Sequence, residues 1–293
     1  MEHFSAHGVL RLAAAVVVIW LAAAGCQPAL REGPVSPIEP TRGKQNINEA
    51  IAALDAHRER IKPIRAGGNC LVEWYESNGT KHKENPAIQV RLVPPDLLFF
   101  MGEILGNEVV RFGTNSREFW LRAKPKEINS YWWGRRETAQ RCRGGGFLNP
   151  ESVLEALGIV HVDTRWAFVG WGGFDILTLH DEEGRPVKSV HVDWRDYLVK
   201  KIEYFDVYGQ ARMTARMSGY GDNTGGVPVP TQIDILFLNS ADGSLSINMT
   251  LRDVRLFEPT EEQLAGKLFA RPDTEGFENV YILADNCEFV RVE

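Results

Sequence analysis

The chain has 293 residues, of which 44% are hydrophobic, and a formal net charge of −6 at pH 7. This acidic balance excludes nucleic-acid binding, because contact with phosphate backbones requires a basic field on the protein. The length beyond residue 46 suits one large domain with a sizeable core better than two compact domains.

The N-terminus carries the features of an exported lipoprotein. An unbroken apolar run, residues 12–24, is too short to span a bilayer comfortably and is typical of a signal peptide. Ala24 and Gly25 are the small residues that lipoprotein signal peptidase needs before a lipid-modified cysteine, here Cys26. Residues 1–25 are therefore predicted to be a lipoprotein signal peptide, with lipid attached to Cys26. The alternative is an ordinary secretory signal cleaved near Ala24, which would leave Cys26 as a free thiol.

A proline-rich segment follows this cysteine. Residues 26–45 contain four prolines and few apolar side chains, which is the composition of an extended, solvated tether. The three acyl chains of a mature lipoprotein anchor it permanently, whereas one chain gives only marginal attachment. Gln27, rather than Asp, follows Cys26, and this favours release to an outer membrane. We therefore expect a lipid-anchored protein on the periplasm-facing side of the outer membrane.

The folded region is predicted to begin with an amphipathic helix at residues 48–61. Ile51 and Leu54 recur at helical spacing, and a proline follows the end of the segment. Asn46 or Asn48 can cap its start. After this helix the hydrophobic period changes from helical to alternating.

Short alternating stretches, separated by turn sequences, continue to the C-terminus. Strands are predicted in the first half at 70–76, 87–93, 97–104, 108–112, 118–122 and 130–133. A second helix is predicted at 150–157, because Asn149 supplies a cap and Pro150 suits the first helical position. Strands are predicted in the second half at 166–169, 174–180, 186–193, 197–207, 211–220, 231–239 and 244–256. A short helix at 259–268 and strands at 280–283 and 288–292 complete the series, which indicates a mainly β (α+β) antiparallel meander.

Five segments resemble strand and turn elements of a known family. They are residues 92–98, 113–121, 200–210, 227–233 and 268–272. With the order of helices and strands, they resemble the bacterial outer-membrane lipoprotein-sorting family, the LolA/LolB-like carriers and receptors. The resemblance covers most of the mature chain and includes no catalytic fingerprint. It implies an unclosed antiparallel β-barrel with helices covering a concave apolar side, formed by one domain at residues 46–293.

One position departs from the family pattern. Pro94 stands where the soluble carrier has an arginine that helps to hold its lid. The predicted N-terminal lipid anchor is also absent from the soluble carrier. Both differences favour a receptor or another anchored relative over the carrier itself.

The resemblance implies a protein that binds lipid, or the acyl chains of lipoproteins, in lipoprotein sorting or envelope lipid handling. An apolar hollow can hold an acyl chain without directed bonds, because each buried methylene contributes roughly 0.8 kcal/mol. Candidate cavity residues are bulky side chains on alternating strands: Leu98, Phe100, Val110, Phe112, Phe119, Leu121, Phe168, Ile176, Phe237 and Met249. The alternative for each of them is a place in a filled core. A second function also remains open, a non-catalytic envelope scaffold or assembly lipoprotein that binds a protein partner.

Aromatic and basic residues lie close together near residue 135 and are candidates for membrane contact, because tryptophan rings sit at headgroup depth and cations meet phosphate. These candidates are Trp132, Trp133, Arg135, Arg136, Arg141 and Arg143. The alternative is a packed strand followed by a solvated loop.

The sequence offers little support for catalysis. The residues available for acid–base chemistry or metal binding are His161, Asp163, His180, Asp181, His191 and Asp193. Their spacing fits no common ligand pattern, and no nucleophile or phosphate-binding motif accompanies them. We expect no enzyme activity, cofactor or metal. One disulfide can form among Cys70, Cys142 and Cys287, and the sequence leaves the pairing open.

Overall fold

The computed structural model describes residues 43–75, 79–124, 128–142, 149–221, 226–238 and 245–292. The predicted signal peptide, Cys26, most of the predicted tether and Arg143 lie outside the described residues. Within the described ranges, no helix has the length and hydropathy needed to cross a membrane.

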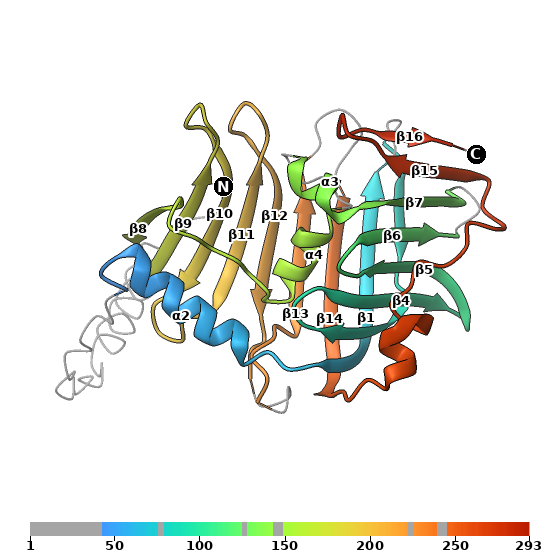
Figure 1. Ribbon diagram of the computed structural model, residues 1–293, viewed down its shortest axis with the longest axis horizontal. Coiled ribbons are helices and arrows are strands. Elements are labelled where there is room, and N and C mark those ends of the chain that lie inside the picture. The colour runs from blue at the N-terminus through green and yellow to red at the C-terminus, as the bar shows by residue number, and fades with distance from the viewer. Residues whose placement is uncertain are drawn as a thin grey trace, which may run out of the picture. The chain divides into compact units, whose positions relative to one another are not determined.

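One large sheet dominates the structure (Figure 1). Its first strands along the chain are β1 (Ile64–Tyr75), β2 (Lys81–Glu84), β3 (Ala87–Val93), β4 (Leu97–Ile104), β5 (Asn107–Thr114), β6 (Glu118–Ala123) and β7 (Ser130–Arg135). The later strands are β8 (Ala167–Trp171), β9 (Phe174–His180), β10 (Pro186–Asp193), β11 (Val199–Phe205), β12 (Ala211–Ser218), β13 (Gln232–Phe237), β14 (Leu245–Leu256), β15 (Asn279–Leu283) and β16 (Phe289–Arg291).

The strands pair in the order β16-β15-β7-β6-β5-β4-β3-β1-β14-β13-β12-β11-β10-β9-β8, and β2 pairs with β1 beside this path. The sheet therefore ends at β16 and β8 without closing, which confirms the predicted unclosed antiparallel barrel. The pairing of β1 with β14 joins the half of the sheet that contains β3–β7 to the half that contains β8–β13. One pair differs from the prediction, because β15 runs parallel to β7.

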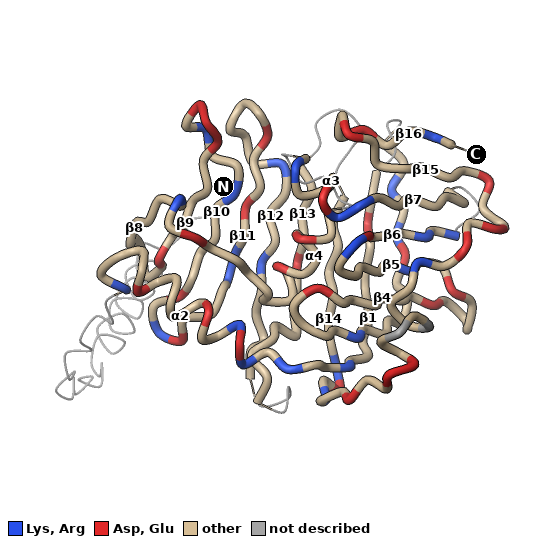
Figure 2. Tube along the Cα trace, viewed as in Figure 1, with Lys and Arg blue, Asp and Glu red and all other residues tan. Residues whose placement is uncertain are grey.

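Alternation gives the sheet one buried face. Val90 on β3 faces Phe100 on β4, and Phe100 faces Phe112 on β5. In the other half, Val190 on β10 faces Ile202 on β11, and both are fully buried. Residues of the opposite parity lie on the other face, as the two-residue period of a strand requires. Figure 2 shows that acidic and basic residues are interspersed along the chain.

The helices α2 (Ile47–Glu59), α3 (Arg136–Arg141) and α4 (Pro150–Ala156) lie in front of the sheet in Figure 1. Asn46 caps α2 by accepting a hydrogen bond from the Glu49 amide at 3.0 Å, and Ala50 and Leu54 are its buried residues. Asn149 caps α4 in the same way, and Pro150 occupies its first turn. Both helices predicted from caps and spacing are confirmed.

The differences from the predicted elements have local causes. β1 begins at Ile64, well before the predicted residue 70. The prediction missed its first residues because Gly67 and Gly68 interrupt the apolar alternation of the strand. α3 forms where the basic segment was interpreted as a loop, since residues 136–141 are mostly good helix formers. The predicted helix at 259–268 contains a π-helical turn, Gln263–Lys267.

The end of the predicted tether already belongs to the folded domain. The Lys44 amide donates to Asp175 Oδ2 at 2.9 Å, and the Lys44 ammonium lies 4.8 Å from the centre of the Tyr197 ring. A Cβ atom on Gly43 would come within 2.0 Å of the Asp175 carboxylate, so only glycine fits this approach. The last residues of the segment at 26–45 therefore pack against the sheet instead of extending into solvent.

The cysteine pairing is settled among the three cysteines of the folded domain. Cys142, which follows α3, forms a disulfide with Cys287 in the turn between β15 and β16. Cys70 on β1 is a free and buried thiol. The disulfide fastens α3 to the strands at one end of the sheet.

Candidate functional site

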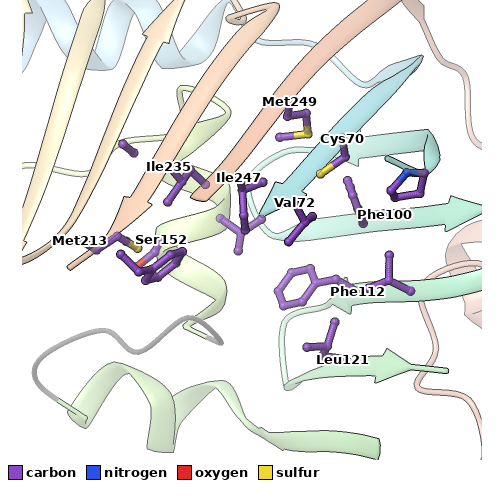
Figure 3. A pocket seen from close by; sticks show the side chains of 15 residues that line it. Cys70, Val72, Phe100, Phe112, Leu121, Ser152, Met213, Ile235, Ile247 and Met249 are labelled. Atoms are coloured by element: carbon purple, nitrogen blue, oxygen red, sulfur yellow. The ribbon is translucent and has the colours of Figure 1, made fainter. Parts of the chain in front are cut away.

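A partly open cavity of about 150 Å³ lies on the concave side of the sheet, beside α4 (Figure 3). It is lined by Cys70, Val72, Pro86, Phe100, Val110, Phe112, Leu121, Ser152, Val153, Met213, Ala215, Ile235, Phe237, Ile247 and Met249. Apart from the Ser152 hydroxyl and the Cys70 thiol, every lining side chain is a hydrocarbon or a thioether. The site is therefore suited to an apolar group and offers little to a polar one.

Strands from both halves of the sheet build the cavity walls. β5 and β6 contribute Phe112 and Leu121, which face each other across the strand pair. β13 and β14 contribute Ile235 and Ile247, which also face each other. Val72 on β1 pairs with Ile247 and lies between the two groups (Figure 3). The curvature of the unclosed sheet thus brings residues far apart in the sequence to one hollow.

α4 places Ser152 and Val153 at the cavity, and an ion-pair cluster holds one side of this helix. Arg136, at the start of α3, contacts the Asp96 carboxylate at 3.0 Å. Its Nε also donates to Glu151 of α4 at 3.1 Å. The Arg136 side chain is only 12% exposed, so this arginine joins α3, α4 and the turn before β4 inside the fold.

A second cluster holds α4 to the other half of the sheet. Glu155 is 4% exposed and accepts hydrogen bonds from the Lys188 ammonium on β10 and the Tyr204 hydroxyl on β11. Lys188 also lies 5.1 Å from the centre of the Trp166 ring. Burial, followed by the charge of Glu155, raises the pKa of Tyr204 well above its usual value, so this hydroxyl stays protonated and donates.

The two polar groups at the cavity are themselves well buried. Ser152 is 8% exposed, and its hydroxyl has no hydrogen-bond partner of good geometry among the described residues. Cys70 is 5% exposed, and burial raises the pKa of its thiol to about 11. Cys70 is therefore protonated at neutral pH and behaves as a small apolar side chain.

The structure brings part of the predicted cavity set together. The residues that line the cavity are Phe100, Val110, Phe112, Leu121, Phe237 and Met249. Leu98 and Phe119 are each 1% exposed and belong to the packed core. Phe168 packs half-buried against that core. Ile176 requires a correction, because both of its neighbours, Asp175 and Leu177, are fully buried and alternation places Ile176 on the opposite face of β9.

The predicted membrane-contact residues do not form one exposed surface. Trp132 stacks on Tyr281 with ring centres 5.7 Å apart. Trp133, which points to the opposite face of β7, lies 3.9 Å from the Arg271 guanidinium. Neither tryptophan is among the exposed large side chains.

The described arginines of that set also separate. Arg136 is largely shielded in the cluster beside α4, where it pairs with Asp96 and Glu151, which corrects its assignment to a membrane-contact loop. Arg135 is exposed at the end of β7. Arg141 is exposed and pairs with Asp285 at 3.0 Å. A membrane-contact role for the exposed pair remains a prediction.

The histidines and aspartates considered for catalysis are dispersed. Asp163, Asp181 and Asp193 each bind an arginine within four residues along the chain. His191 lies 2.9 Å from Glu203 on the face opposite the cavity, and burial lowers the pKa of this histidine. No group of three or more His, Cys, Asp or Glu suited to a metal ion occurs among the described residues.

Sequence reasoning missed several cavity residues. Val72, Ile235 and Ile247 follow the same alternation as the predicted set, so a systematic count of inward positions would have found them. Met213 faces Phe237 across β12 and β13 and had the same signal. Ser152 and Val153 had none, because the side of α4 that meets the cavity depends on the packing of the helix.

Comparison with known proteins gives a likeness of structure only. No family model and no curated protein sequence matches this chain. A LolA superfamily protein from Nitrosomonas europaea is 16% identical, with a TM-score of 0.46, and the match covers 76% of this chain and 97% of that chain. A domain of an outer membrane lipoprotein-sorting protein from Vibrio parahaemolyticus is 12% identical, with a TM-score of 0.49 and coverages of 74% and 97%.

A DUF1329 family protein from Desulfovibrio piger is 9% identical, with a TM-score of 0.48 and coverages of 75% and 97%. Proteins of the group that the sequence resembles are thus among the structures similar to this one, as predicted. At these values the likeness carries no functional assignment.

Proposed function

We propose that this protein binds the acyl chains of lipids or lipoproteins in its concave cavity. The observation that carries the proposal is the partly open hollow whose walls are apolar except for one hydroxyl and one protonated thiol. Such a surface is costly to leave in water, and each methylene that it shelters contributes roughly 0.8 kcal/mol.

The cavity volume sets the length of chain that it can hold. A cavity of about 150 Å³ is the size of one that accepts a benzene molecule, so it takes a segment of about six carbons. Those carbons contribute about 5 kcal/mol, or between about 10³- and 10⁴-fold in affinity. The remainder of a long acyl chain lies along the open side of the hollow.

The wider proposal places this binding at the cell envelope. Cys26 carries the lipid anchor, the proline-rich segment extends the domain from the outer membrane, and the domain faces the periplasm. In this arrangement the protein receives lipid or acylated lipoprotein, and it performs no catalysis. The non-catalytic scaffold that binds a protein partner is the competing function.

Mass spectrometry of purified protein tests the proposal directly. The protein is purified from the envelope and extracted with organic solvent, and the lipids are quantified against protein. The anchor of Cys26 is covalent, so non-covalent lipid is the measured quantity. Co-purified phospholipid or acylated peptide supports the proposal, whereas an extract without non-covalent lipid favours the scaffold.

A chain-length series adds a quantitative test. Alkyl carboxylates of increasing length are titrated into delipidated protein. Affinity is expected to rise about fourfold per methylene up to about six carbons and more slowly beyond. An affinity that does not depend on chain length contradicts acyl binding in the cavity.

A further inference from the structure

A second pocket lies on the sheet face opposite the acyl cavity, where β1 begins and β14 ends. It has a volume of about 370 Å³ and is lined by Arg65, Ala66, Gly67, Gln89, Val90, Arg91, Asp253 and Arg255. No residue of this pocket lines the acyl cavity. The lining is strongly basic, since three of these residues are arginines and one is an acid.

The register of the sheet forces the three arginines together. Arg65 on β1 is the cross-strand partner of Arg255 on β14 and also of Arg91 on β3. Side chains directly opposite each other on adjacent strands have Cβ atoms about 5 Å apart, and like charges at such positions are destabilising. The protein therefore keeps an unfavourable row of three guanidinium groups on one face of the sheet.

The row is poorly neutralised by the protein itself. Arg255 lies 3.6 Å from the Asp253 carboxylate, and both side chains are well exposed. Arg65 is exposed and has no carboxylate partner among the described residues. The pocket therefore retains about two positive charges in a chain whose net charge is −6. Such a local reversal of sign attracts anions.

Two structural features shape the pocket. Arg91 lies 5.6 Å from the centre of the Phe99 ring and 5.9 Å from that of Phe257, and these contacts limit its guanidinium to one region. A β-bulge interrupts the register of β1 and β14 beside Arg65. Asp253 in this bulge has a φ of 50°, an uncommon conformation for a residue other than glycine. Bulges commonly redirect side chains at functional sites.

We propose that this arginine pocket binds a phosphate group. Phosphate offers several oxygen acceptors and up to two negative charges, which match three guanidinium forks with one competing carboxylate. A single carboxylate group needs only one such fork. The phosphate comes either from the headgroup of an anionic phospholipid or from a soluble phosphate, and the two sources share this recognition chemistry.

Calorimetric titration of the full chain with inorganic phosphate, at low ionic strength, tests the site. Replacing the two exposed arginines together, Arg65→Gln with Arg255→Gln, is expected to weaken phosphate binding at least about tenfold. The charge-matched control is Arg117→Gln with Arg216→Gln, at two exposed arginines outside the pocket. Its affinity for phosphate is expected to stay within about twofold of that of the unaltered protein. Unchanged binding in the Arg65/Arg255 variant overturns the proposal.

An opposite change separates recognition from damage to the fold. Asp253→Asn removes the competing carboxylate, and asparagine tolerates the positive φ at this position. This variant is expected to bind phosphate about threefold to tenfold more tightly, which a nonspecific disturbance of the sheet does not produce. Weaker binding by Asp253→Asn contradicts the proposed role of the arginine row.

Vesicles identify the source of the phosphate. Binding to mixed phosphatidylglycerol and phosphatidylcholine vesicles is compared with binding to phosphatidylcholine alone, so that the contribution of any lipid anchor cancels. A difference that disappears in the Arg65/Arg255 variant assigns the site to lipid headgroups, and binding of inorganic phosphate alone assigns it to a soluble phosphate. A glutamate-rich peptide serves as a polyanion without phosphate. The proposal is overturned if neither phosphatidylglycerol vesicles nor inorganic phosphate binds, or if only this peptide binds.

Discussion

Removal of the Glu155 carboxylate tests how α4 is held beside the cavity. Glu155→Leu leaves the Lys188 ammonium, whose side chain is 15% exposed, without its counter-charge. It also leaves the Tyr204 hydroxyl without the acceptor that it contacts in the buried cluster. An unpaired charge of this kind costs about 3–5 kcal/mol of the free energy of unfolding.

The reciprocal change has a similar expected cost. Lys188→Met leaves the Glu155 carboxylate, 6% exposed, without a cation. The double variant, Glu155→Leu with Lys188→Met, removes both charges and leaves only the Tyr204 hydroxyl unsatisfied. Its expected loss is therefore about 1–3 kcal/mol, less than that of either single variant.

Urea denaturation, monitored by tryptophan fluorescence, measures all three variants against the unaltered chain. The interaction energy follows from the double-mutant cycle. Single losses below about 1 kcal/mol, or losses that add in the double variant, would refute the interpretation of Glu155 and Lys188 as a buried and coupled pair.

Three further predictions concern titration and cysteine chemistry. Burial lowers the pKa values of His57 and His161 below 6.5, so the unfolded chain binds more protons below this pH. Stability present above pH 6.5 is thus expected to fall as the pH drops below 6.5, and urea midpoints that stay constant or rise would contradict this. Cys70, with a pKa of about 11, is expected to resist iodoacetamide at about pH 8 until urea unfolds the chain, and rapid labelling of native protein would count against its burial. Serine replacement of the Cys142–Cys287 disulfide, which spans 145 residues, is expected to cost about 5 kcal/mol, and an unchanged melting temperature would show that it adds no constraint.

Local signals made much of the fold predictable. The start of α2 follows from the Asn46 cap, and the strands β3, β4, β9 and β10 have the predicted bounds because their alternation is continuous. β1 was placed too late, since glycines in a strand carry no hydrophobic signal. The parallel pairing of β15 with β7 depends on where the chain returns, which local patterns do not contain.

The candidate site was only partly predictable for a similar reason. Alternation identifies an inward position, but it does not separate a filled layer from a hollow one. Leu98 and Phe100 both point inward from β4, yet only Phe100 reaches the cavity. Arg136 was interpreted as a surface cation because its acidic partners, Asp96 and Glu151, lie far from it in the sequence.

Binding of a fluorescent fatty acid to a pair of tryptophan variants tests the central claim most directly. Ile247→Trp places an indole in the cavity of about 150 Å³, whereas Ile176→Trp makes the same change on the opposite face of the sheet. The acyl-binding account predicts that Ile247→Trp lowers the affinity for the fluorescent fatty acid at least about tenfold. It also predicts that Ile176→Trp binds the fatty acid with the affinity of the unaltered protein. Equal binding by both folded variants would contradict the account.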